Sequence, residues 1–157
     1  MISIDNVDAL ADLLTQNKLT ISVAESCTGG TLASTLTSLS GASVYFDRGF
    51  VTYSNKAKQD LLGVNKDTIT KYGAVSEHVA LEMVKGVIKN STSDFAVAIT
   101  GIAGPSGGTT TKPVGMVCFG LSTYGNNLTS TQLFKGDRLS IISQSVEYSI
   151  EQLLKQS

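Results

Sequence analysis

The stretch Ser22–Gly30, SVAESCTGG, contains the transition that indicates the fold class. The apolar run Thr20–Ala24 has the length and composition of a buried strand. It ends at Glu25, where a serine, a cysteine, a threonine and two glycines follow before a helical pattern begins. A polar turn between a buried strand and a helix is typical of the sheet edge where α/β proteins bind ligands.

Helical patterns and apolar strands alternate along the rest of the chain. Amphipathic spacing and capping residues predict helices over Asp5–Gln16, Thr28–Leu39, Asn55–Gly63, Glu77–Lys89 and Leu139–Lys155. Apolar runs predict strands over Thr20–Ala24, Gly49–Ser54 and Phe95–Thr100, and a hairpin around Tyr124–Asn127. The segment Val64–Val75 is expected to be a loop. This order predicts one three-layer α/β/α domain over residues 1–157, with a mixed, mostly parallel sheet.

Composition excludes several function classes. The chain has 157 residues and is 41% hydrophobic, and its formal net charge of −1 leaves no basic footprint for nucleic acid. Its N-terminus lacks the positive region of a signal peptide, and no apolar run reaches membrane-spanning length, so we expect a cytoplasmic protein. The charged fraction of 16% is low. We therefore expect part of the surface to be covered in a homo-oligomer.

The cysteines and the histidine offer little chemistry. Cys27 and Cys118 form no recognisable disulfide framework and are interpreted as reduced thiols. The only histidine is His78, so no metal-ligand cluster and no cofactor are expected. Cys27 is a rival nucleophile because a helix start lowers the pKa of a thiol, but a cysteine nucleophile is usually paired with histidine. An inert buried cysteine is the favoured interpretation.

Ser26 is the candidate nucleophile on chemical grounds. On a turn before a helix it lies near free N–H groups that can stabilise an oxyanion, and the glycine pair lets a substrate approach closely. A serine before a helix is also an ordinary N-cap, which the turn alone favours. A nucleophilic serine needs a base, and His78 is better explained as a solvated position at a helix start.

Lysine is the remaining common base for serine, and Lys58 is the candidate. It falls in the first turn of a predicted helix, where the helix dipole disfavours the ammonium by about 0.3–1 kcal/mol. That is too little to make a base, so burial must supply the rest, and a solvated lysine is otherwise the simpler interpretation. The hydroxyl of Tyr53 could relay a proton between serine and lysine, or the ring could be a rim aromatic.

Two further features suggest anion or substrate contacts. Arg48 and Arg138 are the only arginines, and each follows an aspartate and adjoins a loop. A guanidinium suits a phosphate or a carboxylate, whereas an ion pair with the neighbouring aspartate is the structural alternative. The glycine-rich segment Gly101–Gly108, GIAGPSGG, is neither a Walker A nor a GxGxxG motif and indicates only a closely approaching loop.

Six motifs occur in a fixed order: AESCTGG, RGFVTYSNKAK, GAVSE, TGIAGPSGG, KPVG and GDR. Together they resemble the C-terminal domain of the competence/damage-inducible CinA family, over about residues 5–155. The family includes a stand-alone form, a nicotinamide-nucleotide amidase, and larger members with an additional N-terminal domain outside this sequence. The resemblance implies metal-free hydrolysis of the carboxamide of nicotinamide mononucleotide to nicotinate mononucleotide and ammonia, through serine and lysine.

The resemblance also implies roles for individual residues. Neutral Lys58, in one version through Tyr53, takes the proton from Ser26, whose Oγ attacks the carboxamide carbon before water hydrolyses the acyl-enzyme. Backbone N–H groups hold the oxyanion, and Arg48 or Arg138 holds the 5′-phosphate. The residues expected to bind substrate are Glu25, Cys27, Thr28, Gly29, Gly30, Arg48, Thr100, Gly101, Gly104 and Arg138.

Two alternatives stay open. One is a catalytically silent module that binds a pyridine nucleotide or a partner protein linked to competence or DNA damage. The other is an amidase that acts on a different small amide. The intact set Ser26, Tyr53 and Lys58 speaks against the silent module. The expected partners are a small pyridine mononucleotide and further copies of the chain, with neither nucleic acid nor membrane.

Overall fold

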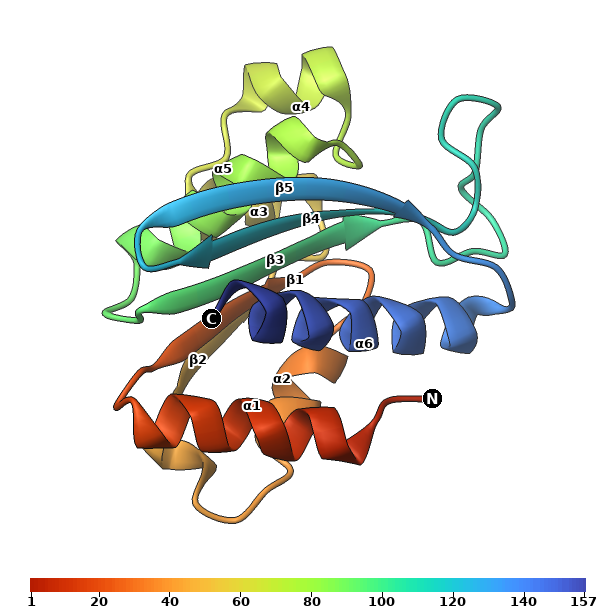
Figure 1. Cartoon of the computed structure of the whole chain (residues 1–157). Coiled ribbons are helices and arrows are strands. Elements are labelled where there is room, and N and C mark those ends of the chain that lie inside the picture. The colour runs from red at the N-terminus through yellow and green to blue at the C-terminus, as the bar shows by residue number, and fades with distance from the viewer.

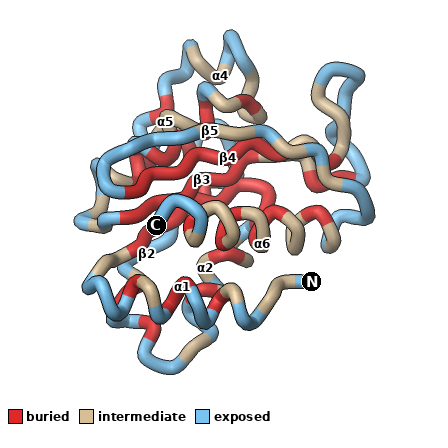
Figure 2. Tube along the Cα trace, viewed as in Figure 1, coloured by how far each residue is buried: buried red, intermediate tan, exposed pale blue.

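Three apolar strands form the centre of the sheet. The structure, a computed structural model, describes residues 1–157. β1 (Ile21–Glu25) pairs in parallel with β3 (Phe95–Gly101), which pairs antiparallel with β4 (Met116–Thr123). Almost every residue of these strands is buried (Figure 2). Continuous apolar runs are what strands covered on both faces require.

The two edge strands complete the predicted mixed sheet. β2 (Phe46–Val51) pairs in parallel with β1, and β5 (Asn126–Leu133) pairs antiparallel with β4, which gives the order β2-β1-β3-β4-β5. All strands except β4 therefore run in one direction. The predicted hairpin is confirmed, with its turn at Tyr124 and Gly125.

Helices cover both faces, which confirms the three layers (Figure 1). One face carries α1 (Ile4–Gln16), α2 (Thr31–Leu36) and α6 (Arg138–Gln156), packed over the larger core cluster. The other carries α3 (Asn55–Leu62), α4 (Lys66–Tyr72) and α5 (Glu77–Lys89). A short 3₁₀ turn, Ala42–Val44, precedes β2. None of the helices has both the length and the apolar character to cross a membrane.

Capping residues set the helix starts next to the sheet edge. The side chains of Ser54, Ser76 and Asp137 accept hydrogen bonds from the first-turn N–H groups of α3, α5 and α6, as predicted. Gly120 of β4 brings α5 onto the sheet, because a Cβ atom there would lie 2.4 Å from the Ala80 carbonyl oxygen. Gly120 pairs with Ala98 of β3, so this contact packs the first turn of α5 against the middle of the β3–β4 pair.

The structure differs from the predicted elements in three places, one of them a helix that was missed. The expected loop over Val64–Val75 contains α4, which Asn65 caps and Gly73 (φ +81°) ends. β2 lies three residues before the predicted strand, because the segment after Val51 already turns into α3. α2 starts only at Thr31, since the two preceding glycines have left-handed backbone conformations.

Candidate active site

Ser26 lies directly after β1, at the carboxyl edge of the sheet. Its N–H donates to the Ile99 carbonyl at 3.0 Å, so the β1–β3 ladder fixes its backbone. The residue is 8% exposed and its side chain faces a cavity. Ser26 does not cap α2, because the carboxylate of Glu25 accepts from the N–H groups of Leu32 and Ala33 at 2.8 and 2.9 Å. The serine hydroxyl is therefore free for another role.

Lys58 contacts Ser26 from α3, which packs on the sheet face that also carries α4 and α5. Its Nζ lies 3.0 Å from Ser26 Oγ and 3.0 Å from the Thr52 carbonyl oxygen. The Tyr53 carbonyl oxygen is 3.4 Å away. Lys58 is the fourth residue of α3, which starts at the Ser54 cap just after β2 ends beside β1. The parallel β1–β2 pairing thus brings the two side chains together.

The environment of Lys58 favours its neutral form. The side chain is only 1% exposed, and the salt bridges of the chain, Arg48–Asp47 and Lys56–Asp60, do not involve it. Burial without a carboxylate partner lowers the pKa of Lys58 below its ordinary value. In the structure Nζ donates to Ser26 Oγ and to the carbonyls of Thr52 and Tyr53. A neutral amine has only two N–H donors, so in that form it can donate to the two carbonyls and turn its lone pair to the hydroxyl proton of Ser26.

The Tyr53 hydroxyl is not placed between serine and lysine. It accepts a hydrogen bond from Arg138 Nη2 at 3.0 Å, on the solvent side of the cavity. Only the Tyr53 carbonyl approaches the pair, at 3.5 Å from Ser26 Oγ. In this structure Lys58 and Ser26 are in direct contact, and the Tyr53 hydroxyl lies outside that contact.

The cavity beside the pair has a volume of about 320 Å³. Its floor is formed by the Ser26–Cys27 turn and by Lys58, and its walls by two loops, at residues 74–75 and 100–107. The backbone N–H groups of Cys27, Ala103 and Gly104 bind no acceptor in the chain. Free N–H groups around a serine hydroxyl are what an oxyanion requires.

Arg138 forms the rim of the cavity. Its Nη1 donates to the Gly104 carbonyl oxygen at 2.8 Å, which joins α6 to the glycine-rich loop. The guanidinium has no acidic partner, because Asp137 caps α6 instead. This exposed guanidinium is the arginine of the chain that can meet an anionic group of a bound molecule.

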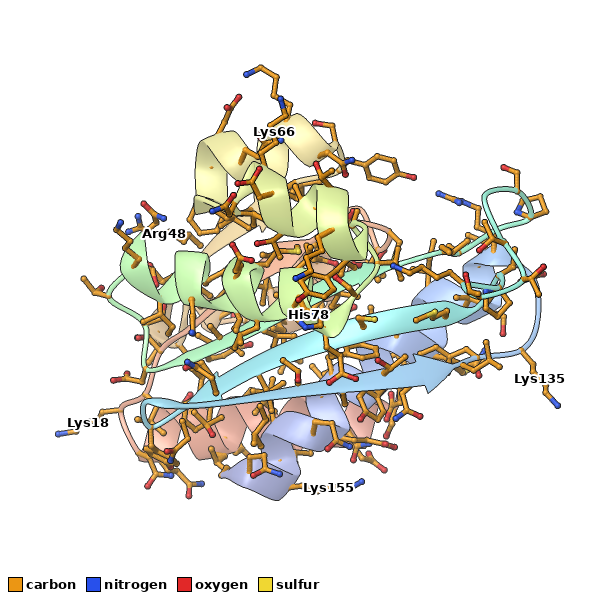
Figure 3. All side chains as sticks on the ribbon, turned by 90° about the horizontal axis from the view of Figure 1, so that it is seen from above. Lys18, Arg48, Lys66, His78, Lys135 and Lys155 are labelled. Atoms are coloured by element: carbon orange, nitrogen blue, oxygen red, sulfur yellow. The ribbon has the colours of Figure 1, made fainter.

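Several residues expected at the site lie elsewhere. Arg48 bonds Asp47 and the Asn90 carbonyl, and it lies at the opposite end of the molecule from Lys135, which closely precedes Arg138 (Figure 3). Gly29 and Gly30 line a different cavity of about 580 Å³ beside α1. Thr28 and Glu25 are buried and do not reach the site cavity. β2 directs the Arg48 guanidinium away from the site cavity, and the Glu25 carboxylate is hydrogen-bonded to the start of α2.

The remaining expected residues come together in one cavity: Ser26, Cys27, Tyr53, Lys58, Thr100, Gly101, Gly104 and Arg138. Sequence reasoning missed Ala74 and Val75, which also line it. Both residues belong to the GAVSE motif, which was noted in the sequence without any of its residues being assigned to the site. Thr100 Oγ1 donates to the Ala74 carbonyl at 2.9 Å, which ties this wall to β3.

The alternative nucleophile and base are unsuited to the reaction. Burial raises the pKa of the Cys27 thiol to about 12, so it is protonated at neutral pH. His78 stacks on the ring of Tyr72, with ring centroids 3.5 Å apart, and lines a separate cavity. Of these candidates, the serine–lysine pair is the one whose side chains are in hydrogen-bond contact.

Fold and site define an α/β protein with a buried serine–lysine pair at the carboxyl edge of its sheet. The chain belongs to the CinA C-terminal domain family, which it matches over residues 5–157. It is 49% identical over 137 residues to the nicotinamide-nucleotide amidohydrolase PncC of Enterobacter agglomerans, covering 87% of this chain and 84% of that protein. The PncC of Escherichia coli K12 is 46% identical over 138 residues, with the same coverage.

Longer relatives match through part of their length. A protein of Caldicellulosiruptor bescii called competence-damage inducible is 47% identical over 148 residues, and the match spans 94% of this chain and 36% of that protein. Solved structures agree with the fold. A CinA superfamily protein of Escherichia coli superposes with a TM-score of 0.94 at 35% identity, covering 100% of this chain and 94% of that one. A competence/damage-inducible protein of Agrobacterium tumefaciens gives 0.91 at 42% identity, covering 99% and 97%.

Proposed function

We propose that residues 1–157 form an amidohydrolase that converts nicotinamide mononucleotide to nicotinate mononucleotide and ammonia. The observation that carries the proposal is the 3.0 Å contact between Lys58 Nζ and Ser26 Oγ at a cavity edge. The PncC relatives, named as nicotinamide-nucleotide amidohydrolases, support the choice of substrate.

Acylation begins with proton transfer from Ser26 to Lys58. The lone pair of the neutral amine accepts the hydroxyl proton as Oγ attacks the carboxamide carbon. The negative charge that develops on the carboxamide oxygen is held by the free N–H groups of Cys27, Ala103 and Gly104. These backbone groups are fixed before the substrate arrives, so no reorganisation is needed during the reaction.

The tetrahedral intermediate then loses ammonia. Protonated Lys58 returns its proton to the departing nitrogen, the C–N bond breaks, and an ester forms between Ser26 and the nicotinoyl group. A water molecule, deprotonated by Lys58, attacks this ester, and the proton passes back to Ser26 Oγ. Serine and lysine are regenerated, and the products are the carboxylate and ammonia.

The charges of the site match those of the substrate. A pyridinium ring carries a positive charge, which a neutral Lys58 tolerates and an ammonium would repel. The phosphate at the other end of the nucleotide requires a cation, and Arg138 at the rim supplies it. With Lys58 in its neutral form, the amide end of the cavity carries no charge, and Arg138 places a positive charge at its opening.

Ammonia release tests the proposal. Wild-type protein is incubated with nicotinamide mononucleotide in the presence of EDTA, and both ammonia and nicotinate mononucleotide are quantified. Stoichiometric release of both products supports the proposal. A protein that binds the nucleotide and releases no ammonia is the silent module, and release from other small amides in preference to this one identifies an amidase of different specificity.

A further inference from the structure

The two loops that wall the cavity are joined by very few hydrogen bonds. One wall is the Ala74–Val75 segment between α4 and α5, and the other is the loop between β3 and β4. No backbone hydrogen bond connects them. Besides the Thr100 bond to the Ala74 carbonyl, the connection comes from one side chain, that of Lys112.

Lys112 holds the Ala74–Val75 segment from both ends. Its Nζ donates to the carbonyl oxygens of Tyr72 and Val75, the second at 2.7 Å. Tyr72 is the last residue of α4, so the ammonium also meets the negative end of that helix. Hydrogen bonds from a charged donor are about twice as strong as neutral ones, which makes this the stronger of the two tethers.

The surroundings of Lys112 are shaped to receive the ammonium. Gly73 leaves the space it occupies, because a Cβ atom at that position would lie 2.6 Å from Lys112 Nζ. The backbone of Lys112 is fixed by Thr109, whose N–H donates to the Lys112 carbonyl at 2.8 Å and whose Oγ1 accepts from the Lys112 N–H at 3.0 Å. Lys112 has no acidic partner.

The root of the β3–β4 loop is anchored without Lys112. Ile102 N–H donates to the Met116 carbonyl at 2.9 Å, and Gly115 N–H donates to the Ile102 carbonyl at 2.7 Å. Arg138 holds the Gly104 carbonyl. The oxyanion donors of Ala103 and Gly104 therefore keep their place when Lys112 is removed, and the Ala74–Val75 wall is the part that is released.

We propose that Lys112 is a positioning residue that fixes the Ala74–Val75 wall of the cavity by clamping the carbonyls of Tyr72 and Val75. The inference rests on the proposed function for its substrate. The wall lines the cavity that would hold the substrate and forms no hydrogen bond with Ser26 or Lys58. Its loss therefore weakens the binding of substrate and transition state equally, which raises KM and spares kcat.

The test compares Lys112→Met with Lys112→Arg and with Lys66→Met. Lys66 lies at the other end of α4 and projects into solvent, which makes it the matched control (Figure 3). For nicotinamide mononucleotide, Lys112→Met is expected to raise KM at least about tenfold and to keep kcat within about threefold. Lys112→Arg, which keeps the charge, recovers part of the KM, and Lys66→Met matches the wild type.

Hydrogen exchange gives a readout that does not depend on activity. The bonded amides that flank the clamped segment are those of Gly73 and Val79. Both exchange faster in Lys112→Met if the clamp exists, and Lys112→Arg serves if the methionine variant does not fold. An unchanged KM, a fall in kcat alone, or unchanged exchange overturns the inference. If the wild type releases no ammonia, the proposed function fails, and the exchange rates alone decide whether the clamp exists.

Discussion

Lys58 Nζ lies 3.0 Å from Ser26 Oγ, although the residues are 32 positions apart in the chain. The parallel pairing of β1 with β2 places Glu25 opposite Val51, so the turn after each strand starts at the same edge of the sheet. Ser26 follows the first strand directly, and α3 carries Lys58 back over the second turn. The strand register and the short β2–α3 connection together bring the two side chains within hydrogen-bond distance.

The first prediction concerns the pH dependence of activity. Only neutral Lys58 accepts the proton of Ser26, and burial lowers the pKa of Lys58 below 10.5. We expect kcat/KM to rise with pH on the acid side and to level off above the lowered pKa. The measurement is a pH profile of ammonia release at limiting substrate. A rate that falls as pH rises through this range would mean that the protonated lysine, and not the neutral amine, is the active form.

The second prediction concerns the pH dependence of stability. A lysine with a lowered pKa binds fewer protons in the folded than in the unfolded state, so its burial destabilises the fold most below the lowered pKa. This penalty fades as pH rises toward 10.5. We expect the free energy of unfolding of the wild type, relative to Lys58→Met, to increase as pH rises from the lowered pKa toward 10.5. Urea denaturation of both proteins at several pH values measures this difference. A difference that does not change with pH would mean that the pKa of Lys58 is not lowered in the folded protein.

The third prediction concerns Cys27. Because burial raises the pKa of its thiol to about 12, we expect iodoacetamide at mildly alkaline pH to modify Cys27 only after unfolding in urea. Peptide mass spectrometry identifies the modified residue. Cys27→Ala retains the backbone N–H and is expected to lower kcat/KM less than about tenfold. Rapid labelling of the folded protein with loss of activity would return Cys27 to candidacy as the nucleophile.

The fourth prediction separates the two arginines. Arg138→Met removes the cation at the cavity rim and is expected to raise KM for nicotinamide mononucleotide about tenfold or more. KM for nicotinamide riboside, which lacks the phosphate, is expected to change little. Arg48→Met is the control, because Arg48 bonds Asp47 and Asn90 outside the cavity. Equal effects on both substrates would place the phosphate elsewhere.

Local patterns were sufficient for much of the fold. Buried strands such as Phe95–Thr100 and capped helices such as the one after Ser76 carry their signals in a few neighbouring residues, and both were predicted. α4 was missed because its β-branched residues Thr68, Ile69 and Thr70 weaken the helical signal. Asn65 and Gly73, the cap and stop that bound it, were overlooked.

The site was only partly accessible from sequence. The sequence singled out Lys58 by its place in the first turn of the predicted helix, but its burial, which lowers its pKa, comes from packing rather than from spacing. The hydrogen bond of Glu25 to the start of α2 and the outward direction of Arg48 likewise depend on tertiary structure. The homo-oligomer expected from the low charge stays a prediction, which sedimentation can measure.

The most direct test of the account compares kcat/KM for ammonia release in four proteins: wild type, Ser26→Ala, Lys58→Met and Lys56→Met. Lys56 lies on the same helix but is exposed and pairs with Asp60, so Lys56→Met controls for the loss of a lysine charge. We expect Ser26→Ala to lose at least about 10⁴-fold, Lys58→Met about 10²–10⁴-fold, and Lys56→Met almost nothing. Activity of Lys58→Met equal to that of Lys56→Met would contradict the central claim that Lys58 is the base for Ser26.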